Sequence, residues 1–300
     1  MMAVAAKKAS PVMLTNSSSP GWNNFKETLG RMIKSPTSKI GWIMLILMFV
    51  FCFGAPLFAP YDPDEIVLAN RLLAPCAEHL FGCDALGRDL LSRLLYGGRY
   101  SLLLGLAASI FGSFVGVVIG SVAGYFGGNI ENIIMRAMDV LSALPSILLC
   151  IIVSVALGDG FINTVLALSI GQIPASVRMM RAQILSERGA EYLEACETIN
   201  CSKISIMFKH LLPNTISPMI VCLTMGIGDN ITMAASLSYI GLGVKPPTPE
   251  WGALLSDARN YMMSYPYMII FPGIFIALTV LAANLVGDGL RDALDPKLRK

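Results

Sequence analysis

Six apolar stretches, each close to 20 residues long, constrain this chain more than any other feature of its sequence. They cover residues 40–58, 101–125, 137–157, 161–177, 217–240 and 267–286. A helix needs about 20 mainly apolar residues to cross the hydrocarbon core of a bilayer, which is about 30 Å thick, because each residue adds about 1.5 Å. The sequence therefore predicts an all-α membrane protein with six transmembrane helices in a lipid bilayer.

The composition supports a membrane protein and argues against a nucleic-acid partner. Charged residues make up 14% of the 300 residues and hydrophobic residues 55%, whereas an ordinary soluble domain has roughly 25% charged residues. The net charge is only +2, and the basic residues do not gather into one long tract. We therefore expect no nucleic acid among the partners.

The distribution of lysine and arginine predicts the orientation. If the N-terminus is cytoplasmic, 16 of the 22 lysine and arginine residues fall on the cytoplasmic side. Loops that remain in the cytoplasm carry an excess of these residues. Both termini are therefore predicted to be cytoplasmic, together with the polar segment between the fourth and fifth spans.

Two regions follow from this organisation. Residues 1–39 are predicted to be a cytoplasmic N-terminal tail, and residues 40–300 the transmembrane domain. Within the tail, Trp22, Phe25 and Leu29 recur at helical spacing, with Lys26 and Arg31 nearby. This pattern predicts a short interfacial helix before the first span, and a frayed linker is the alternative.

Four glycines stand four residues apart in the second span, at positions 112, 116, 120 and 124. Glycines at this spacing share one helix face and allow another helix backbone to approach closely. Packing within the same subunit is the favoured interpretation. A homodimer seam or a pore-lining seam is the alternative.

Polar residues inside predicted spans are candidates for function, because they are costly in lipid. Asp229 and Asn230 lie in the middle of the fifth span, after the glycines at 226 and 228, and are candidates for lining a translocation path. Arg136 and Asp139 lie three residues apart at the start of the third span, where a structural ion pair on one helix face is expected.

The segment between the fourth and fifth spans is unusually polar for this chain. Residues 190–199 and 205–211 predict two short helices joined by a bend, and Glu191 and Glu194 place acidic side chains on one face of the first helix. Two short helices at the membrane surface form a compact knob. Its shape suits docking into a groove on a soluble partner.

This segment carries a resemblance to a known family. Glu194-Ala195-Cys196, then Asn200, then Leu212-Pro213 resembles the EAA signature of permease subunits of bacterial ABC importers, with its spacing preserved. Cys196 stands where the family usually has alanine, and Asn200 stands where it usually has glycine. Asparagine visits the left-handed region most readily after glycine, so the bend is expected to survive.

Two further segments resemble one branch of that family. Residues 79–101 and 237–257 are similar to loops of the second permease subunit of dipeptide, oligopeptide and nickel importers. With the EAA-like segment, the resemblance covers residues 40–300.

The resemblance implies a transport subunit of the bacterial cytoplasmic (inner) membrane and not an enzyme. Its implied partners are a second permease subunit in a heterodimer, two ATPase subunits and an external solute-binding protein. ATP and Mg would be bound by the ATPases, with no cofactor and no metal in this chain, which has no GxxxxGK[ST] phosphate-binding run.

The resemblance also implies roles for residues of the EAA-like segment. Glu194 would meet a basic residue of the ATPase, and Ala195 would pack into its groove. The residues assigned to coupling are Glu191, Glu194, Ala195, Cys196, Asn200, Leu212 and Pro213.

The cargo is less constrained than the machinery. Di- and oligopeptides are the first expectation, and nickel or a metal chelate is the alternative. An autonomous channel or an ion-driven carrier is the alternative from another class, although neither requires an EAA-like segment.

The predicted external loops supply the remaining candidates. Pro247, Glu250 and Trp251 are expected to contact the binding protein. Residues 86–95 predict a separate amphipathic helix at the outer surface, with a bracing role as the alternative. Cys76 and Cys83 lie in an external loop where oxidation is possible, and we hypothesise that they form a disulfide.

Overall fold

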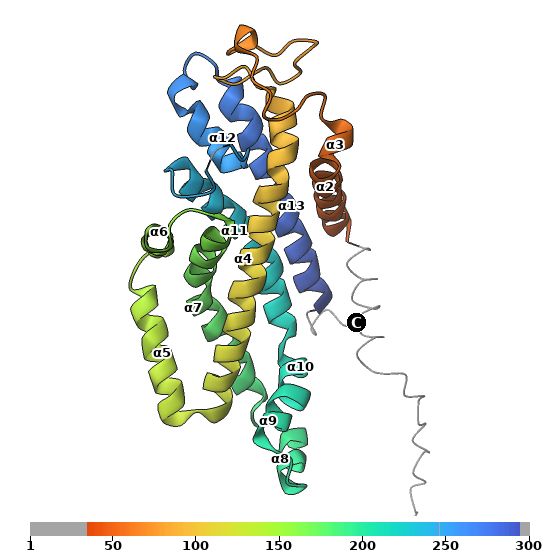
Figure 1. The fold of residues 1–300 in the computed structure, drawn as a ribbon. Helices are drawn as coiled ribbons and strands as arrows, with labels where there is room; N and C mark the ends of the chain where they lie inside the picture. The colour runs from red at the N-terminus through yellow and green to blue at the C-terminus, as the bar shows by residue number, and fades with distance from the viewer. Residues whose placement is uncertain (1–34, 246, 295–300) are drawn as a thin grey trace, which may run out of the picture.

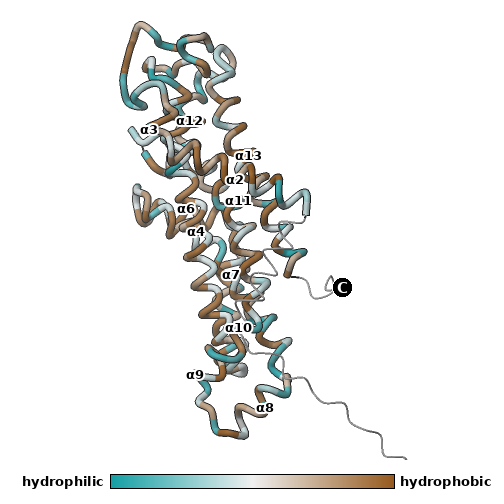
Figure 2. Tube along the Cα trace, turned by 90° about the vertical axis from the view of Figure 1, so that its right-hand side faces the viewer, coloured by the Kyte–Doolittle hydropathy of each residue, from teal (hydrophilic) through white to brown (hydrophobic). Residues whose placement is uncertain are grey.

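The computed structural model describes residues 35–245 and 247–294, and the predicted interfacial helix lies outside these residues. Within them, all regular structure is helical apart from one isolated bridge between Cys83 and Asp89. The molecule is elongated, and α4 (Leu90–Phe126) runs along much of its length (Figure 1). Figure 2 shows hydrophilic segments gathered toward the two ends, as a membrane-spanning body requires.

Four of the described helices are long and apolar enough to cross a membrane. They are α2 (Pro36–Phe53), α4, α11 (Ser217–Tyr239) and α13 (Tyr267–Leu294). They match the first, second, fifth and sixth predicted spans. The 37 residues of α4 correspond to about 55 Å, so this helix extends beyond the hydrocarbon core.

The third predicted span is not one continuous helix. The chain forms α5 (Gly128–Ser142) and α6 (Ser146–Leu157), which meet at an angle of 89°. Pro145 is the N-cap of α6, and a proline disfavours helical backbone at the residue before it. The expectation of an unbroken span was therefore wrong at residues 143–145.

The fourth predicted span lies on α7 (Phe161–Glu187), which follows the expected tight turn. Gly158 and Gly160 have φ values of 78° and 132°, a conformation that favours glycine. The apolar run of α7 is interrupted by Gln172 and Pro174. The described residues hold four helices that qualify as spans by length and composition, or five if the bent pair is one span. The count of six stays a prediction.

The glycine face of α4 packs against α7 of the same chain. A Cβ at Gly116 would lie 2.2 Å from Ser176 Cβ, and one at Gly120 would lie 2.7 Å from Met180 Cβ. Gly112 and Gly124 face α7 in the same way. The favoured interpretation of the glycine ladder, packing within the subunit, is confirmed.

Ion pairs join α7 to α5. Arg181 Nε donates to Glu131 Oε1 at 2.6 Å, and Arg178 Nη2 lies 3.5 Å from Asp139 Oδ1. The expected pair between Arg136 and Asp139 is therefore replaced by a pair between two helices. These ion pairs hold α5, which lies at one side of the molecule, against the pair formed by α4 and α7 (Figure 1).

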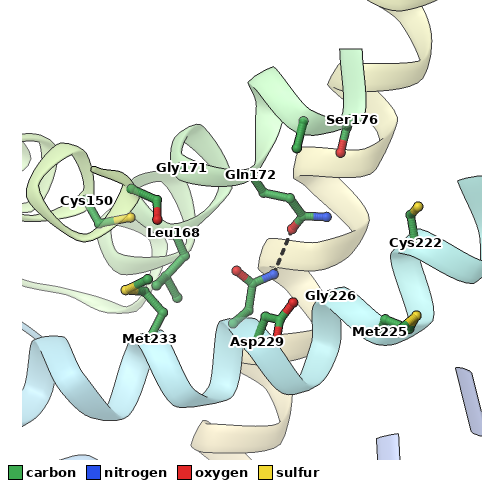
Figure 3. Close-up of a pocket in the computed structure, with 13 residues that line it drawn as sticks. Cys150, Leu168, Gly171, Gln172, Ser176, Cys222, Met225, Gly226, Asp229 and Met233 are labelled. Atoms are coloured by element: carbon green, nitrogen blue, oxygen red, sulfur yellow. Dashed lines mark hydrogen bonds between the residues drawn. The ribbon is translucent and has the colours of Figure 1, made fainter. Parts of the chain in front are cut away.

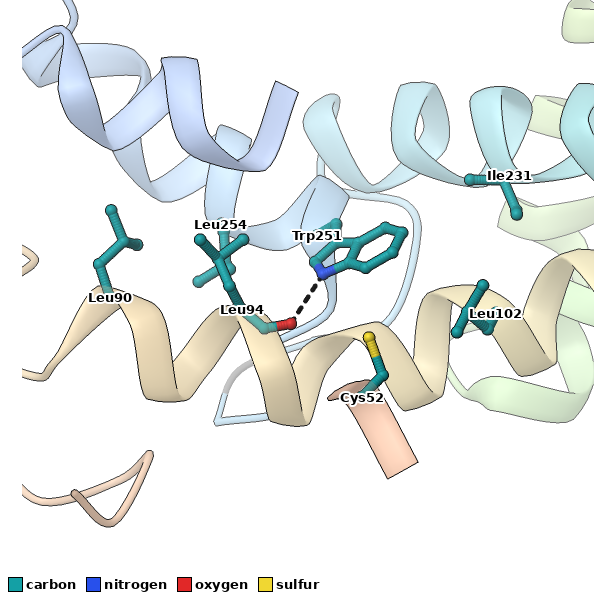
Figure 4. Close-up of a cluster of buried hydrophobic side chains, with 7 residues drawn as sticks. All are labelled: Cys52, Leu90, Leu94, Leu102, Ile231, Trp251 and Leu254. Atoms are coloured by element: carbon teal, nitrogen blue, oxygen red, sulfur yellow. Dashed lines mark hydrogen bonds between the residues drawn. The ribbon is translucent and has the colours of Figure 1, made fainter. Parts of the chain in front are cut away.

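The end of the molecule opposite α8 is built from loop and short helices. It holds α3 (Ala55–Phe58), η1 (Leu68–Asn70), α12 (Trp251–Ala258) and η3 (Arg259–Tyr261). Residues 90–95, expected in a separate surface helix, are instead the first turns of α4, capped by Asp89, which accepts from the Ser92 amide at 2.8 Å. Leu90 and Leu94 are buried in a core with Trp251 (Figure 4), which agrees with the bracing alternative.

Candidate functional site

The EAA-like segment forms the lower tip of the molecule in Figure 1. Its elements are α8 (Glu191–Thr198), α9 (Lys203–Ser205), the π-helix η2 (Ile206–Leu211) and α10 (Leu212–Thr215). The two predicted helices and the bend between them are present, although the second is split into three short pieces. This tip lies far from the loops that precede α4 and α12 (Figure 1).

The α8 helix has one buried face and one exposed face. Leu193 and Cys196 are buried, with 6% and 9% of their surface exposed. Glu191, Glu194 and Ala195 are exposed. Because residues three and four apart share a helix face, the two glutamates and Ala195 form one accessible surface. We call these three residues the α8 face.

Cys196 therefore points into the subunit and not toward a partner. It belongs to a cluster with Met180 and Ile184 of α7 and Met219 of α11. Burial, followed by the neighbouring Cys201, raises the pKa of the Cys196 thiol. Its part in the segment is to hold α8 on the bundle.

Asn200 forms the bend after α8. Its φ is 58°, in the left-handed region, and the Cys201 amide donates to the Cys196 carbonyl at 3.0 Å. A left-handed residue followed by this long return bond is the usual C-terminal cap of a helix. Asn200 thus occupies the conformation for which glycine is the most common residue.

The segment then continues into α11 without a loop. Leu211 is fully buried, Leu212 is half-buried and Pro213 is exposed. A proline cannot donate a backbone hydrogen bond and disturbs the preceding helical turn, and here the preceding turn is the π-helix. The seven residues assigned to coupling thus lie in one region, but they do not all face the same way.

A cavity of about 420 Å³ lies between α6, α7 and α11. Both candidate path residues, Asp229 and Asn230, line it. Asn230 Nδ2 donates to Gln172 Oε1 at 2.8 Å (Figure 3), and Gln172 Nε2 donates to Ser113 Oγ at 3.2 Å. Gln172 was not among the sequence candidates. Its polar side chain within an apolar stretch was the signal that could have found it.

Two of the three expected binding-protein contacts are buried. Glu250 has 1% of its surface exposed and Trp251 has none. Glu250 Oε1 accepts from Ser101 Oγ at 2.9 Å, and Trp251 Nε1 donates to the Leu94 carbonyl at 2.9 Å (Figure 4). They fix α12 to α4, so the expected surface contact is corrected for both. Pro247 is exposed, and its contact with a binding protein stays a prediction.

The disulfide hypothesis does not agree with the structure, in which both cysteines are free. Cys76 is exposed, whereas Cys83 is fully buried. The Cys83 amide donates to the Leu73 carbonyl at 2.9 Å, which fixes the backbone at Cys83. Burial, together with the nearby carboxylates of Asp89 and Asp84, raises the pKa of the Cys83 thiol to about 11.

A buried polar network holds the loop that contains Cys83, and the sequence did not reveal it. His79 Nδ1 lies 2.9 Å from Asp89 Oδ1, and Ser92 Oγ donates to Asp89 Oδ2 at 2.8 Å. Arg88 Nε donates to Asp84 Oδ2 at 2.7 Å. Paired and hydrogen-bonded charges of this kind are tolerated inside a protein, and here they make the loop a rigid cap on α4.

Comparison with protein families decides the class. The family model described as "Binding-protein-dependent transport system inner membrane component" matches residues 116–300. The chain belongs to this family. A second model, the N-terminal TM domain of oligopeptide transport permease C, matches residues 23–75 of the permease. The permease is therefore a multi-pass membrane protein and a transport subunit.

Curated relatives extend over nearly the whole permease. A di/tripeptide transport system permease protein DppC of Pseudomonas aeruginosa is 42% identical, over 93% of this chain and 91% of its own. Two glutathione transport system permease proteins GsiD are similar. That of Pectobacterium atrosepticum is 41% identical, over 96% of this chain and 95% of its own. The GsiD protein of Escherichia coli O6:K15:H31 is 42% identical, over 98% of this chain and 97% of its own.

A solved structure supports the fold. A chain of the MetNI methionine ABC transporter, in an inward-facing conformation, aligns with a TM-score of 0.56 and 17% identity. The alignment covers 68% of the permease and 97% of that chain. At this identity the likeness concerns the fold of the permease and not its cargo.

Proposed function

We propose that the permease carries short peptides, of the size of di- and tripeptides or glutathione, across the bacterial cytoplasmic membrane as one subunit of an ATP-driven importer. The similarity to DppC and GsiD proteins over more than nine-tenths of the chain supports this cargo. Nickel or a metal chelate is less favoured, because the relatives named above are peptide and glutathione permeases. Family membership argues against an autonomous channel or carrier.

The observation that carries the proposed mechanism is the exposed α8 face. Glu191, Glu194 and Ala195 are exposed on a helix whose other side is packed on the bundle. In the proposed assembly, six spans place this face in the cytoplasm, where it meets an ATPase subunit that binds ATP and Mg. A second permease completes the path, and a solute-binding protein delivers the peptide at the opposite end.

Two measurements test this proposal. The tagged permease, purified from its native membrane, is expected to bring with it a second permease, ATPase subunits and a binding protein. In the assembled importer, Ala195→Trp is expected to abolish ATP-dependent peptide uptake, because the bulky side chain prevents close docking on the α8 face. Ala195→Ser is the matched control and is expected to retain uptake.

Glu194→Ala is a second test of the same face. It removes a charge-assisted contact with a basic residue of the ATPase, and the loss of such a contact costs about 1.5–3 kcal/mol. Unchanged uptake in both Ala195→Trp and Glu194→Ala, or peptide transport by the permease alone, would contradict the proposal.

A further inference from the structure

The cavity between α6, α7 and α11 contains one charged side chain. Among its 13 lining residues, Asp229 alone carries a charge, and the rest are apolar, small or neutral polar residues. Asp229 is exposed, and within residues 35–245 and 247–294 it makes no side-chain hydrogen bond or ion pair. An ionisable residue in the middle of a membrane-spanning helix is costly unless it faces a water-filled cavity or pairs with another group, and such residues mark substrate pathways.

The neighbouring amides fix the wall beside this carboxylate. Asn230, only 6% exposed, donates to Gln172, which in turn donates to Ser113 of α4. The amides of Asn230 and Gln172 therefore bond to each other and to the bundle. The carboxylate of Asp229 is the group left to meet a ligand.

Sulfur-containing side chains also line the cavity, most of them on the same helix as Asp229. They are Cys150 of α6 and Cys222, Met225 and Met233 of α11, and Figure 3 shows Cys222, Met225 and Asp229 along one face of α11. Methionine is flexible and polarisable, and it adapts to ligands of different shape. A volume of about 420 Å³ falls in the range of small-molecule sites, roughly 300–1,000 Å³.

We propose that Asp229 binds the positively charged amino terminus of a peptide during its passage, while the sulfur-containing side chains around it accommodate variable side chains. An ammonium group suits a carboxylate in charge and hydrogen bonding, and every peptide with a free amino terminus carries one. The inference rests on the proposed function, which supplies peptide as the cargo. It adds the part of the peptide that the permease recognises.

Cys222 provides a native reporter of occupancy. It precedes Asp229 by seven residues, which places it about 10 Å along the same helix face. The assembled importer, in lipid nanodiscs without ATP, is treated with a methanethiosulfonate reagent, and modification of Cys222 is followed by mass spectrometry. Saturating Ala-Ala is expected to slow this modification, whereas N-acetyl-Ala-Ala, which lacks the ammonium group, is not.

Variants at Asp229 decide whether its charge is responsible. Asp229→Asn is expected to weaken protection by Ala-Ala about tenfold in concentration, because a hydrogen-bonded charge contributes at least that factor. Asp229→Glu is expected to keep part of the protection. Asp288→Asn, at an exposed aspartate of α13 outside the cavity, is the matched control and should behave as the unmodified chain.

Three results would overturn the inference. The first is equal protection by Ala-Ala and N-acetyl-Ala-Ala, and the second is unchanged protection in Asp229→Asn. The third is loss of the second permease from the Asp229→Asn complex, which would show that Asp229 pairs with a cation of that subunit. Peptide uptake is measured on the same preparations. If uptake by the unmodified importer is intact in these cases, only the inference fails, whereas absent uptake of any peptide rejects the proposed function itself.

Discussion

Replacing Trp251 distinguishes a structural role from a surface contact. The indole is fully buried, its ring lies 5.9 Å from that of Phe275 in an edge-on arrangement, and its Nε1 donates to the Leu94 carbonyl. A Cβ on Gly98 would lie 2.7 Å from the indole, so the ring packs directly against the backbone of α4. We expect Trp251→Ala to destabilise the permease strongly.

The magnitude follows from burial and from one hydrogen bond. Replacing a buried tryptophan by alanine typically costs about 3–5 kcal/mol, which includes the cavity that remains. Trp251→Phe keeps an aromatic ring in the core and loses the bond to Leu94, at a cost of about 1–2 kcal/mol. With about 1.6 °C per kcal/mol for a chain of 300 residues, the melting temperature should fall by roughly 6 °C for alanine and about 2 °C for phenylalanine.

The assay is thermal unfolding of the purified complex, with binding-protein affinity measured below the transition. Trp42→Ala, which removes a partly exposed tryptophan from α2, serves as the matched control and should change the melting temperature by much less. Affinity for the binding protein should be unchanged in Trp251→Phe. A Trp251→Ala permease that melts normally but no longer binds the binding protein would refute the reasoning and restore the surface contact.

Three further changes test other features. Gly116→Ala forces a Cβ into α7 and should destabilise the permease by about 1–3 kcal/mol, seen as a lower melting temperature; Gly273→Ala, which has nothing within 4 Å, should not. Asn200→Ala places alanine at a positive φ and should cost about 1–2 kcal/mol and reduce peptide-stimulated ATPase activity, whereas Asn200→Gly should retain it. Maleimide at pH 7–8 should label Cys76 and not Cys83 in the folded permease, because a pKa of about 11 leaves little reactive thiolate at Cys83. Labelling of both cysteines that rises equally with reductant would instead show a disulfide.

Features set by local sequence were predictable. The spans α2, α4, α11 and α13 were predicted correctly, because a membrane helix must form all its own backbone hydrogen bonds and expose apolar side chains to lipid. The packing of the glycine ladder and the turn at residues 158–160 were also predicted correctly, because both depend on the local spacing of glycines. Pro145 signalled the break before α6. The apolar run continues on both sides of this proline, so hydropathy alone predicted one continuous span, which the structure does not have.

Features set by distant contacts were not predictable. Glu250 and Trp251 read as polar and aromatic residues in a proline-rich loop, which is typical of a contact surface. Their partners, Ser101 and Leu94, are about 150 residues away in sequence, and no local pattern brings them together. The burial of Cys196 could not be predicted for the same reason, because the residues that bury it belong to α7 and α11.

The buried cluster between α8, α7 and α11 suggests how a displacement of the α8 face would be transmitted to the cavity. Leu193 and Cys196 share one cluster with Ile184 of α7 and Met219 of α11, so α8 is in contact with the bundle that contains both helices. The same two helices carry Gln172 and Asn230, whose hydrogen bond lies at the cavity. Pro174 lies between Ile184 and Gln172 in α7, whereas α11 has no proline beyond its first turn. Because proline interrupts helical hydrogen bonding and permits bending, α7 can absorb part of the displacement. We therefore expect α11 to transmit the motion more directly, and with it the carboxylate of Asp229.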